Sequence, residues 1–168
     1  DGEKYIRVTG GGSLAVSLSG GTRNSTILLG NTVENHVATY KFVGTGEDYI
    51  VTELALQNCL TDIGGETSSC GPPSAGGDDD AVASVTIEYD NSSGVTEQEA
   101  AFFSGNIAEF RGLDILVPDG DSVDVLVYVD TNSVGAAAAD SGAQFQINLA
   151  ADDQASVNFE AVGLSSGG

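Results

Sequence analysis

Short runs of alternating apolar and polar residues, separated by turn sequences, constrain the fold of this chain more than any other feature. Leu14, Val16 and Leu18 alternate with serine or alanine, and residues 123–129 place valine at every second position. A period of two is typical of strands that bury one face. The same pattern occurs at 38–42, 85–89, 145–149 and 157–159. It predicts an all-β protein of about eight to ten strands, folded as an antiparallel two-sheet sandwich or jelly roll.

Two segments do not show this alternation. Thr96-Glu97-Gln98-Glu99 has the form of a helix capping box, which predicts up to one helical turn over 96–103. Residues 135–140 contain a run of alanines and are compatible with either a short helix or a compact loop. Neither segment is long enough to change the predicted fold class.

The composition combines enough apolar material for a core with a large negative charge. The chain has 168 residues, of which 40% are hydrophobic, and its 25 acidic and 5 basic side chains give a formal net charge of -20. Nucleic acids and anionic membranes repel such a surface, because binding to either needs cationic side chains. No apolar run approaches the roughly 20 residues that span a bilayer. We therefore expect neither nucleic-acid binding nor membrane insertion.

The charge is distributed unevenly along the chain. Residues 1–33 hold three basic and two acidic side chains, a net charge of +1, whereas residues 34–168 hold the other two basic and 23 acidic side chains, a net charge of -21. We divide the chain here into an extended N-terminal arm, residues 1–33, and a β-sandwich domain, residues 34–168. A cationic segment ahead of a strongly acidic domain suggests head-to-tail contact between subunits.

In the predicted contact, the N-terminal arm is donated to the sandwich of the next subunit as an additional strand. The residues predicted at this interface are Lys4, Ile6, Arg7, Val8, Leu14, Val16 and Leu18. The apolar residues would fill core positions, and the basic ones would pair with acidic loops. Because such a heterologous contact does not close on itself, it generates an open filament. The alternative is that the arm folds back as the first strands of its own sandwich.

The two cysteines, Cys59 and Cys70, lie at either end of a polar, glycine-rich segment. A disulfide closing this loop of about 12 residues would contribute roughly 3 kcal/mol in the chain-entropy model. Such a bridge indicates an oxidising, extracellular location. The alternatives are two free thiols or two metal ligands. A zinc site needs four ligands, and His36 is the only histidine.

The sequence contains no pattern typical of a catalytic site. Nucleophilic catalysis needs a serine or cysteine beside a base, and His36 occurs at the start of a predicted strand. Neither a Gly-x-Ser-x-Gly elbow nor a phosphate-binding glycine loop is present. With 25 acidic residues, some pair of carboxylates would meet by chance, and no tryptophan is present to stack on a sugar. We expect a non-enzymatic protein.

Calcium is the metal that the acidic loops would bind, although no cofactor is required by the sequence. Calcium takes six to eight oxygen ligands, commonly from loop aspartates. The candidate ligands are Asp78, Asp79, Asp80, Asp119 and Asp121. The alternative is a solvated acidic surface that keeps a β-rich protein from aggregating. Separately, Asn24 and Asn91 each begin an Asn-x-Ser/Thr tripeptide, the acceptor pattern for N-glycosylation.

Three segments carry a resemblance to a known kind of module. They are Val-Ala-Thr-Tyr-Lys-Phe at 37–42, Gly-Glu-Asp-Tyr-Ile-Val-Thr-Glu-Leu-Ala-Leu at 46–56, and Val-Pro-Asp-Gly-Asp-Ser-Val-Asp-Val-Leu-Val-Tyr-Val-Asp at 117–130. Over residues 34–162 this order resembles the β-sandwich modules of prokaryotic surface-layer or appendage proteins. Those modules often occur as arrays, whereas this chain has one copy and its own N-terminal arm. The architecture is also similar to that of fimbrial subunits that polymerise through donor strands.

Together these features predict an extracellular, self-assembling structural protein at the cell surface. It would be the subunit of a filament or pilus, a homo-oligomer that polymerises by donation of the N-terminal arm. The second interpretation is a monomeric extracellular binding module, either a calcium-dependent adhesin or a carbohydrate-binding sandwich.

Overall fold

The computed structural model of the protein describes residues 4–6, 11–20, 22, 28–60, 81–104, 107–135, 145–150 and 159–165. For residues 4–6 and 59–60 the description covers the backbone only. These ranges form ten strands and contain no α-helix, which confirms the predicted all-β class.

The strands cover most of the described chain. They are β1 (Lys4–Ile6), β2 (Ser13–Leu18), β3 (Asn35–Thr45), β4 (Tyr49–Leu60), β5 (Val82–Asp90), β6 (Thr96–Ala101), β7 (Ile107–Val117), β8 (Ser122–Thr131), β9 (Phe145–Leu149) and β10 (Phe159–Gly163).

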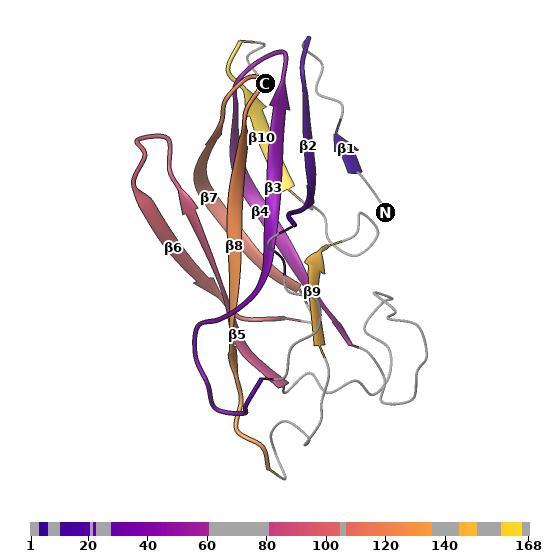
Figure 1. Ribbon diagram of the computed structural model, residues 1–168, viewed down its shortest axis with the longest axis vertical. Coiled ribbons are helices and arrows are strands. Elements are labelled where there is room, and N and C mark those ends of the chain that lie inside the picture. Colours follow the sequence, from indigo (N-terminus) through magenta and orange to yellow (C-terminus); the bar gives the residue numbers. More distant parts are fainter. Residues whose placement is uncertain are drawn as a thin grey trace.

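Two antiparallel sheets pack together as a sandwich. The larger sheet has six strands in the order β1-β2-β3-β8-β5-β6. The smaller sheet has the order β10-β4-β7, and β9 also pairs with β4. In this sheet β10 pairs with the first part of β4, from Tyr49, and β9 pairs with the last part, up to Leu60. In Figure 1, β1 and β2 lie at one side of the larger sheet and β6 at the opposite side.

The alternation seen in the sequence separates the core from the solvent. In β8, Val125, Val127 and Val129 are buried, whereas the residues between them are partly exposed. Phe42 of the larger sheet meets Phe159 of the smaller sheet edge to face, with ring centroids 5.6 Å apart. Apolar burial of this kind is the main favourable contribution to folding. The predicted two-sheet antiparallel sandwich is therefore confirmed.

The pairing of β4 with β7 contains an irregularity that the alternation did not predict. Val51 pairs with Ile115, but Glu53 pairs with Arg111, so β7 has extra residues opposite Thr52. Gly112 lies within this bulge at φ 75°, a left-handed conformation that favours glycine. The bulge changes which residues of both strands face the core.

The predicted helical turn over 96–103 is wrong for its first part, because Thr96–Ala101 forms strand β6. These residues pair with β5 throughout, from Asp90↔Thr96 to Val85↔Ala101. A single helical turn pays the nucleation cost for few hydrogen bonds, whereas the same residues in a hairpin extend an existing ladder. The capping-box pattern was therefore overridden by strand pairing.

Candidate assembly interface

Strand β2, the longest strand of the N-terminal arm, lies in the sheet of its own chain. Leu14 and Val16 are 1% and 3% exposed, whereas Leu18 is 54% exposed. The strand pairs with β3 along its whole length, with Leu14 opposite Gly44 and Leu18 opposite Tyr40. Within one chain, β2 thus contributes two core side chains, and the arm adopts the folded-back arrangement.

The start of β2 occupies a close-fitting site at one end of the sandwich. A Cβ atom at Gly12 would lie 2.7 Å from the carbonyl oxygen of Thr45 and would also overlap the hydroxyl of Tyr49. A Cβ atom at Gly46, which has φ 89°, would lie 2.8 Å from the carbonyl oxygen of Gly11 and 2.9 Å from the Cα atom of Gly12. Only glycine fits where two backbones approach so closely. Residues 11–12 therefore fix how far β2 extends along β3.

The buried side chain of Tyr49 lies against Gly12 in this site. Its side chain is fully buried, and its hydroxyl donates a hydrogen bond of 3.5 Å to Glu47 Oε1. Burial raises the pKa of Tyr49 above its usual value, and the Glu47 carboxylate raises the pKa further. The hydroxyl therefore stays protonated and available as a donor.

Carboxylates hold the segments around this end together. Asp119 Oδ1 accepts a hydrogen bond of 2.6 Å from the Gly46 amide, and the Asp119 amide donates one of 2.7 Å to Asp48 Oδ1. Glu47, only 5% exposed, accepts the amide of Ser165 at 3.0 Å through Oε2. These bonds tie the β3–β4 turn to the β7–β8 turn and to the segment after β10.

The two calcium ligands predicted in this region have structural roles in the chain. Asp119 braces the β3–β4 turn, and Asp121 accepts the amide of Ser122 at 2.7 Å. Among the described residues, no group of three or more His, Cys, Asp or Glu side chains is placed to hold a metal ion. Calcium binding through these loops stays a prediction.

A second charged feature lies at the opposite side of the larger sheet, along β6. Glu97 pairs with Tyr89 and Glu99 with Ile87, and both partners on β5 are core residues. Tyr89 donates a hydrogen bond of 3.3 Å to Glu97 Oε2. Burial, followed by the negative charges of Glu99, Glu97 and Asp114, raises the pKa of Tyr89 to about 12. Glu97 and Glu99 thus lie on the inner face of this sheet edge, and the charge of Asp114 on β7 also acts on Tyr89. We name Glu97, Glu99 and Asp114 the acidic rim.

The β5–β6 turn is fastened to the bulge of β7. The Ser92 amide donates a hydrogen bond of 2.9 Å to the Asp114 carbonyl oxygen, and the Ser92 hydroxyl donates a hydrogen bond to the Asp114 carboxylate. Asn91 is one of the two predicted glycosylation sites. Its Nδ2 donates a hydrogen bond of 2.7 Å to Glu97, and its Oδ1 accepts hydrogen bonds from the amides of Ser93 and Val95. A glycan on Asn91 would be attached to the same nitrogen that donates to Glu97, leaving that nitrogen a single N–H for the bond.

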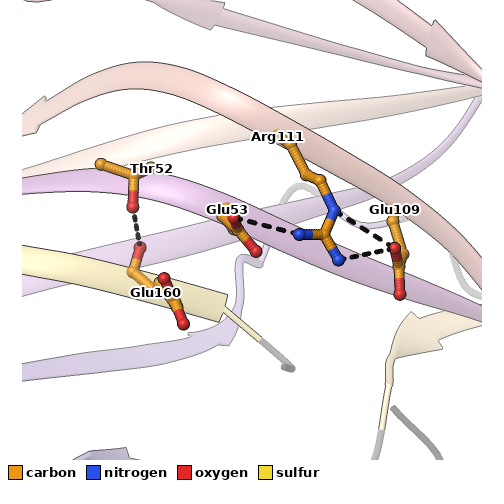
Figure 2. Close-up of polar contacts among 5 residues, drawn as sticks. All are labelled: Thr52, Glu53, Glu109, Arg111 and Glu160. Carbon is orange, nitrogen blue, oxygen red and sulfur yellow. Dashed lines mark hydrogen bonds and ion pairs between the residues drawn. The ribbon is translucent and has the colours of Figure 1, made fainter. Parts of the chain in front are cut away.

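The outer face of the smaller sheet shows a contrasting arrangement, in which acids have a cationic partner. Arg111 lies between Glu53, at 3.4 Å, and Glu109, at 3.0 Å (Figure 2). On the same face, Thr52 donates a hydrogen bond of 3.4 Å to the Glu160 carbonyl, which links β4 to β10. Within the described ranges, the ion pairs are those of Arg111 with these two glutamates.

His36 lies near the start of β3, where the sequence placed it. Its Nε2 is 2.9 Å from the hydroxyl of Thr39, and its ring lies 5.4 Å from that of Tyr128. These contacts give the histidine a place in strand packing.

Several predicted residues cannot be placed by side chain. Lys4 and Ile6 are described by backbone only, as β1 residues opposite Val16 and Leu14, and Cys59 by backbone only, in β4. The remaining residues lie outside the described ranges: Arg7, Val8, Asn24, Cys70, Asp78, Asp79 and Asp80. The disulfide, the Asn24 glycan and the calcium site at 78–80 stay predictions.

Two features of this interface had not been predicted from the sequence. One is the site formed by Gly12, Glu47 and Tyr49, and the other is the attachment of residues 28–34 to β8. The run of glycines at 10–12 was a visible signal for a close backbone approach. Nothing local in the sequence indicated the partner, because it lies more than thirty residues away along the chain.

Comparisons of the chain with models of known protein families and with curated proteins gave no match. In the part of the chain that the structure describes, no helix is long and apolar enough to cross a membrane.

Proposed function

We propose that the protein is the structural subunit of an extracellular filament and that it polymerises by exchanging its N-terminal strands between neighbouring copies. The observation that carries this proposal is the placement of β2, an edge-proximal strand that fills the core with Leu14 and Val16. A strand of this kind can fill the same positions in another copy, because the receiving surface is identical.

The energetics of strand docking permit exchange between copies. Burial of Leu14 and Val16 stabilises the docked strand by about 1.5–3 kcal/mol for each side chain. The backbone ladder with β3 and the fit of Gly12 add to this. All these contacts are the same within one chain and between two chains. The balance between the two states therefore depends on the connection to β3 and on protein concentration.

The connection between β2 and β3 is long enough for exchange, and its later part belongs to the sandwich. Neighbouring antiparallel strands are commonly joined by about two to five residues, whereas this connection covers residues 19–34. The Asn31 amide donates a hydrogen bond of 3.0 Å to the Asn132 carbonyl oxygen, and the Thr131 amide donates one of 2.8 Å to the Thr32 carbonyl oxygen. We propose that residues 1–27 are the unit that moves to the neighbouring copy. Within this unit, residues 19–27 form the linker between β2 and the part of the chain that stays in its own sandwich, and they can span roughly 30 Å when extended.

The extracellular location is part of the same proposal. It is supported by the cysteine spacing and by the scarcity of basic residues, since an acidic surface keeps exposed strands soluble. We include the Cys59–Cys70 disulfide in the proposal. Mass spectrometry of a non-reduced digest would find the linked peptides if the bridge forms and two unlinked cysteine peptides if it does not.

The test is refolding of the full chain at low and at high protein concentration. Exchange predicts monomers after refolding at low concentration and a ladder of oligomers or filaments after refolding at high concentration. Sedimentation velocity and negative-stain microscopy measure both outcomes. Leu14→Asp with Val16→Asp should abolish the oligomers, whereas Leu18→Asp, on the same strand but exposed, should retain them. Monomers at every concentration would contradict the proposal.

A further inference from the structure

The two outer strands of the larger sheet each have an unpaired side. Within the described part of the chain, β1 pairs with β2 alone and β6 pairs with β5 alone. A strand at a sheet edge presents free amide and carbonyl groups, which form a template for another strand. The two edges therefore offer two surfaces for a second copy, beyond the exchange of β2.

The β6 edge carries negative charge that the described residues leave without an ion pair. Glu97 and Glu99 lie on the inner face of the sheet, beside Asp114 of β7. The ion pairs of the described ranges are those of Arg111, on the outer face of the other sheet. Carboxylates on the same face of one strand repel, and a cation placed among them would relieve the repulsion.

The β1 edge supplies a basic residue on the matching face. Lys4 lies opposite Val16 and Ile6 opposite Leu14 in the register with β2. Because opposite positions in an antiparallel pair share a face, Lys4 occupies an inner-face position, as Glu97 and Glu99 do. Lys4 is one of only 5 basic residues in the chain.

From these observations we propose that the β6 edge of one copy binds the β1 edge of a second copy, so that the larger sheet continues from subunit to subunit. Lys4 of the second copy then lies on the same face as the acidic rim of the first. This contact does not require exchange of β2, because β1 is present at the sheet edge when the arm is folded back.

The strand count of the sheet makes this contact compatible with subunits in the same orientation. All neighbouring pairs in the order β1-β2-β3-β8-β5-β6 are antiparallel, so β1 and β6 run in opposite directions. When a second copy is placed beside the first without inversion, its β1 runs antiparallel to β6 of the first. The alternation therefore continues across the boundary, and the contact can repeat indefinitely.

The charges also disfavour the competing arrangement in which like edges meet. A pair of β6 edges would bring the Glu97 and Glu99 residues of two copies together, and opposed like charges destabilise a sheet. A contact between β6 and β1 replaces this repulsion with attraction. Because β1 has only 3 residues, each contact is weak and becomes effective when it repeats along an assembly.

The test uses a chain whose arm cannot exchange, made by Ala15→Cys with Val43→Cys, which are register partners on β2 and β3. Once this disulfide has closed within one chain, self-association reports edge contact alone. Sedimentation equilibrium in low salt should show association of this locked chain. Glu97→Lys with Glu99→Lys, or Lys4→Glu alone, should weaken the association about tenfold. Glu34→Lys with Glu160→Lys makes the same charge change as the Glu97, Glu99 variant on exposed sites outside β1 and β6 and should have no such effect.

Two further measurements make the result decisive. A mixture of the Lys4→Glu chain with the Glu97→Lys, Glu99→Lys chain should restore association, because each supplies the charge that the other needs. Glu97→Gln with Glu99→Gln removes both charges but keeps one side-chain oxygen at position 97, which can accept from Asn91, while the Tyr89 hydroxyl can accept from the new amide nitrogen. It should therefore weaken association while the β5–β6 turn stays folded. Stronger association of the Glu97→Lys, Glu99→Lys chain, or a mixture that stays monomeric, would overturn the proposal. Failure here would leave arm exchange intact, because the locked chain does not report on it.

Discussion

The two sides of the six-stranded sheet are closed in opposite ways. On one side, β2 carries no charged residue and is held by the burial of Leu14 and Val16. On the other side, β6 buries no side chain fully and lines its inner face with Glu97 and Glu99. Apolar burial is the basis on which we propose that β2 can dock in another copy with its contacts intact. Charge is the basis on which we propose that the β6 edge disfavours a second β6 edge and binds a cationic strand.

The largest effect is expected from shortening the buried residues of β2. Leu14→Ala should reduce the free energy of unfolding by about 2–4 kcal/mol, because it leaves a cavity in a close-packed core. Leu18→Ala, on the same strand but 54% exposed, should change the free energy by less than about 0.5 kcal/mol. Urea unfolding measures both. Equal effects of the two substitutions would show that β2 is not held by core burial.

The glycine site should respond next most strongly. Gly12→Ala places a Cβ 2.7 Å from the Thr45 carbonyl oxygen and against the hydroxyl of the buried Tyr49, which should destabilise the protein by about 1–3 kcal/mol. Gly11→Ala is the matched control, since a Cβ there meets no atom within 4 Å. Hydrogen exchange should show faster exchange of the β2 amides in Gly12→Ala only. Unchanged β2 exchange would remove the site from this account.

At the β6 side, stability should depend on alkaline pH through Tyr89. Its pKa is raised from 10.0 to about 12, by burial first and then by Glu99 and Glu97, so folding favours the protonated hydroxyl. This contribution is complete below pH 10 and is lost as the pH rises toward about 12. The midpoint temperature of thermal unfolding should therefore fall less steeply with pH over this interval for Tyr89→Phe than for the unmodified chain. Parallel pH profiles would contradict the assignment.

The smallest effect is expected from removing one charge of the acidic rim. Glu99→Gln should stabilise the isolated subunit by about 0.3–0.5 kcal/mol, because it relieves repulsion with Glu97 on the same face of β6. The effect should shrink as salt is added, since the rim is partly exposed. A loss of stability would show that Glu99 has a favourable partner that the described contacts do not include.

The sequence predicted those strands whose two faces differ. β8 was recognisable because valines occur at alternate positions and become buried, and β2 because Leu14 and Val16 alternate with small polar residues. β6 was missed because an edge strand with little burial has no alternation to detect. The bulge opposite Thr52 concealed β7, since it shifts the face that each later residue occupies.

The interface was less predictable than the fold. The apolar residues of β2 were identified, but whether this strand docks within its own chain or in another has no local signal, because the contacts are the same. The role of Asp119 was obscured for a similar reason. A loop carboxylate that braces a turn and one that binds calcium have the same sequence context, and the bond to the Gly46 amide appears only in three dimensions.

The central claim is that residues 1–27 can dock in a neighbouring copy, and isotope mixing tests it most directly. Unlabelled and ¹⁵N-labelled chains carrying Ala15→Cys with Val43→Cys are refolded together at high concentration and then oxidised. Lys41→Cys with Asp124→Cys, which joins β3 to β8 within the sandwich, serves as the control pair. Exchange predicts mixed-isotope peptides linked through positions 15 and 43 and same-isotope peptides only for the control pair. Same-isotope peptides alone for both pairs would contradict strand exchange.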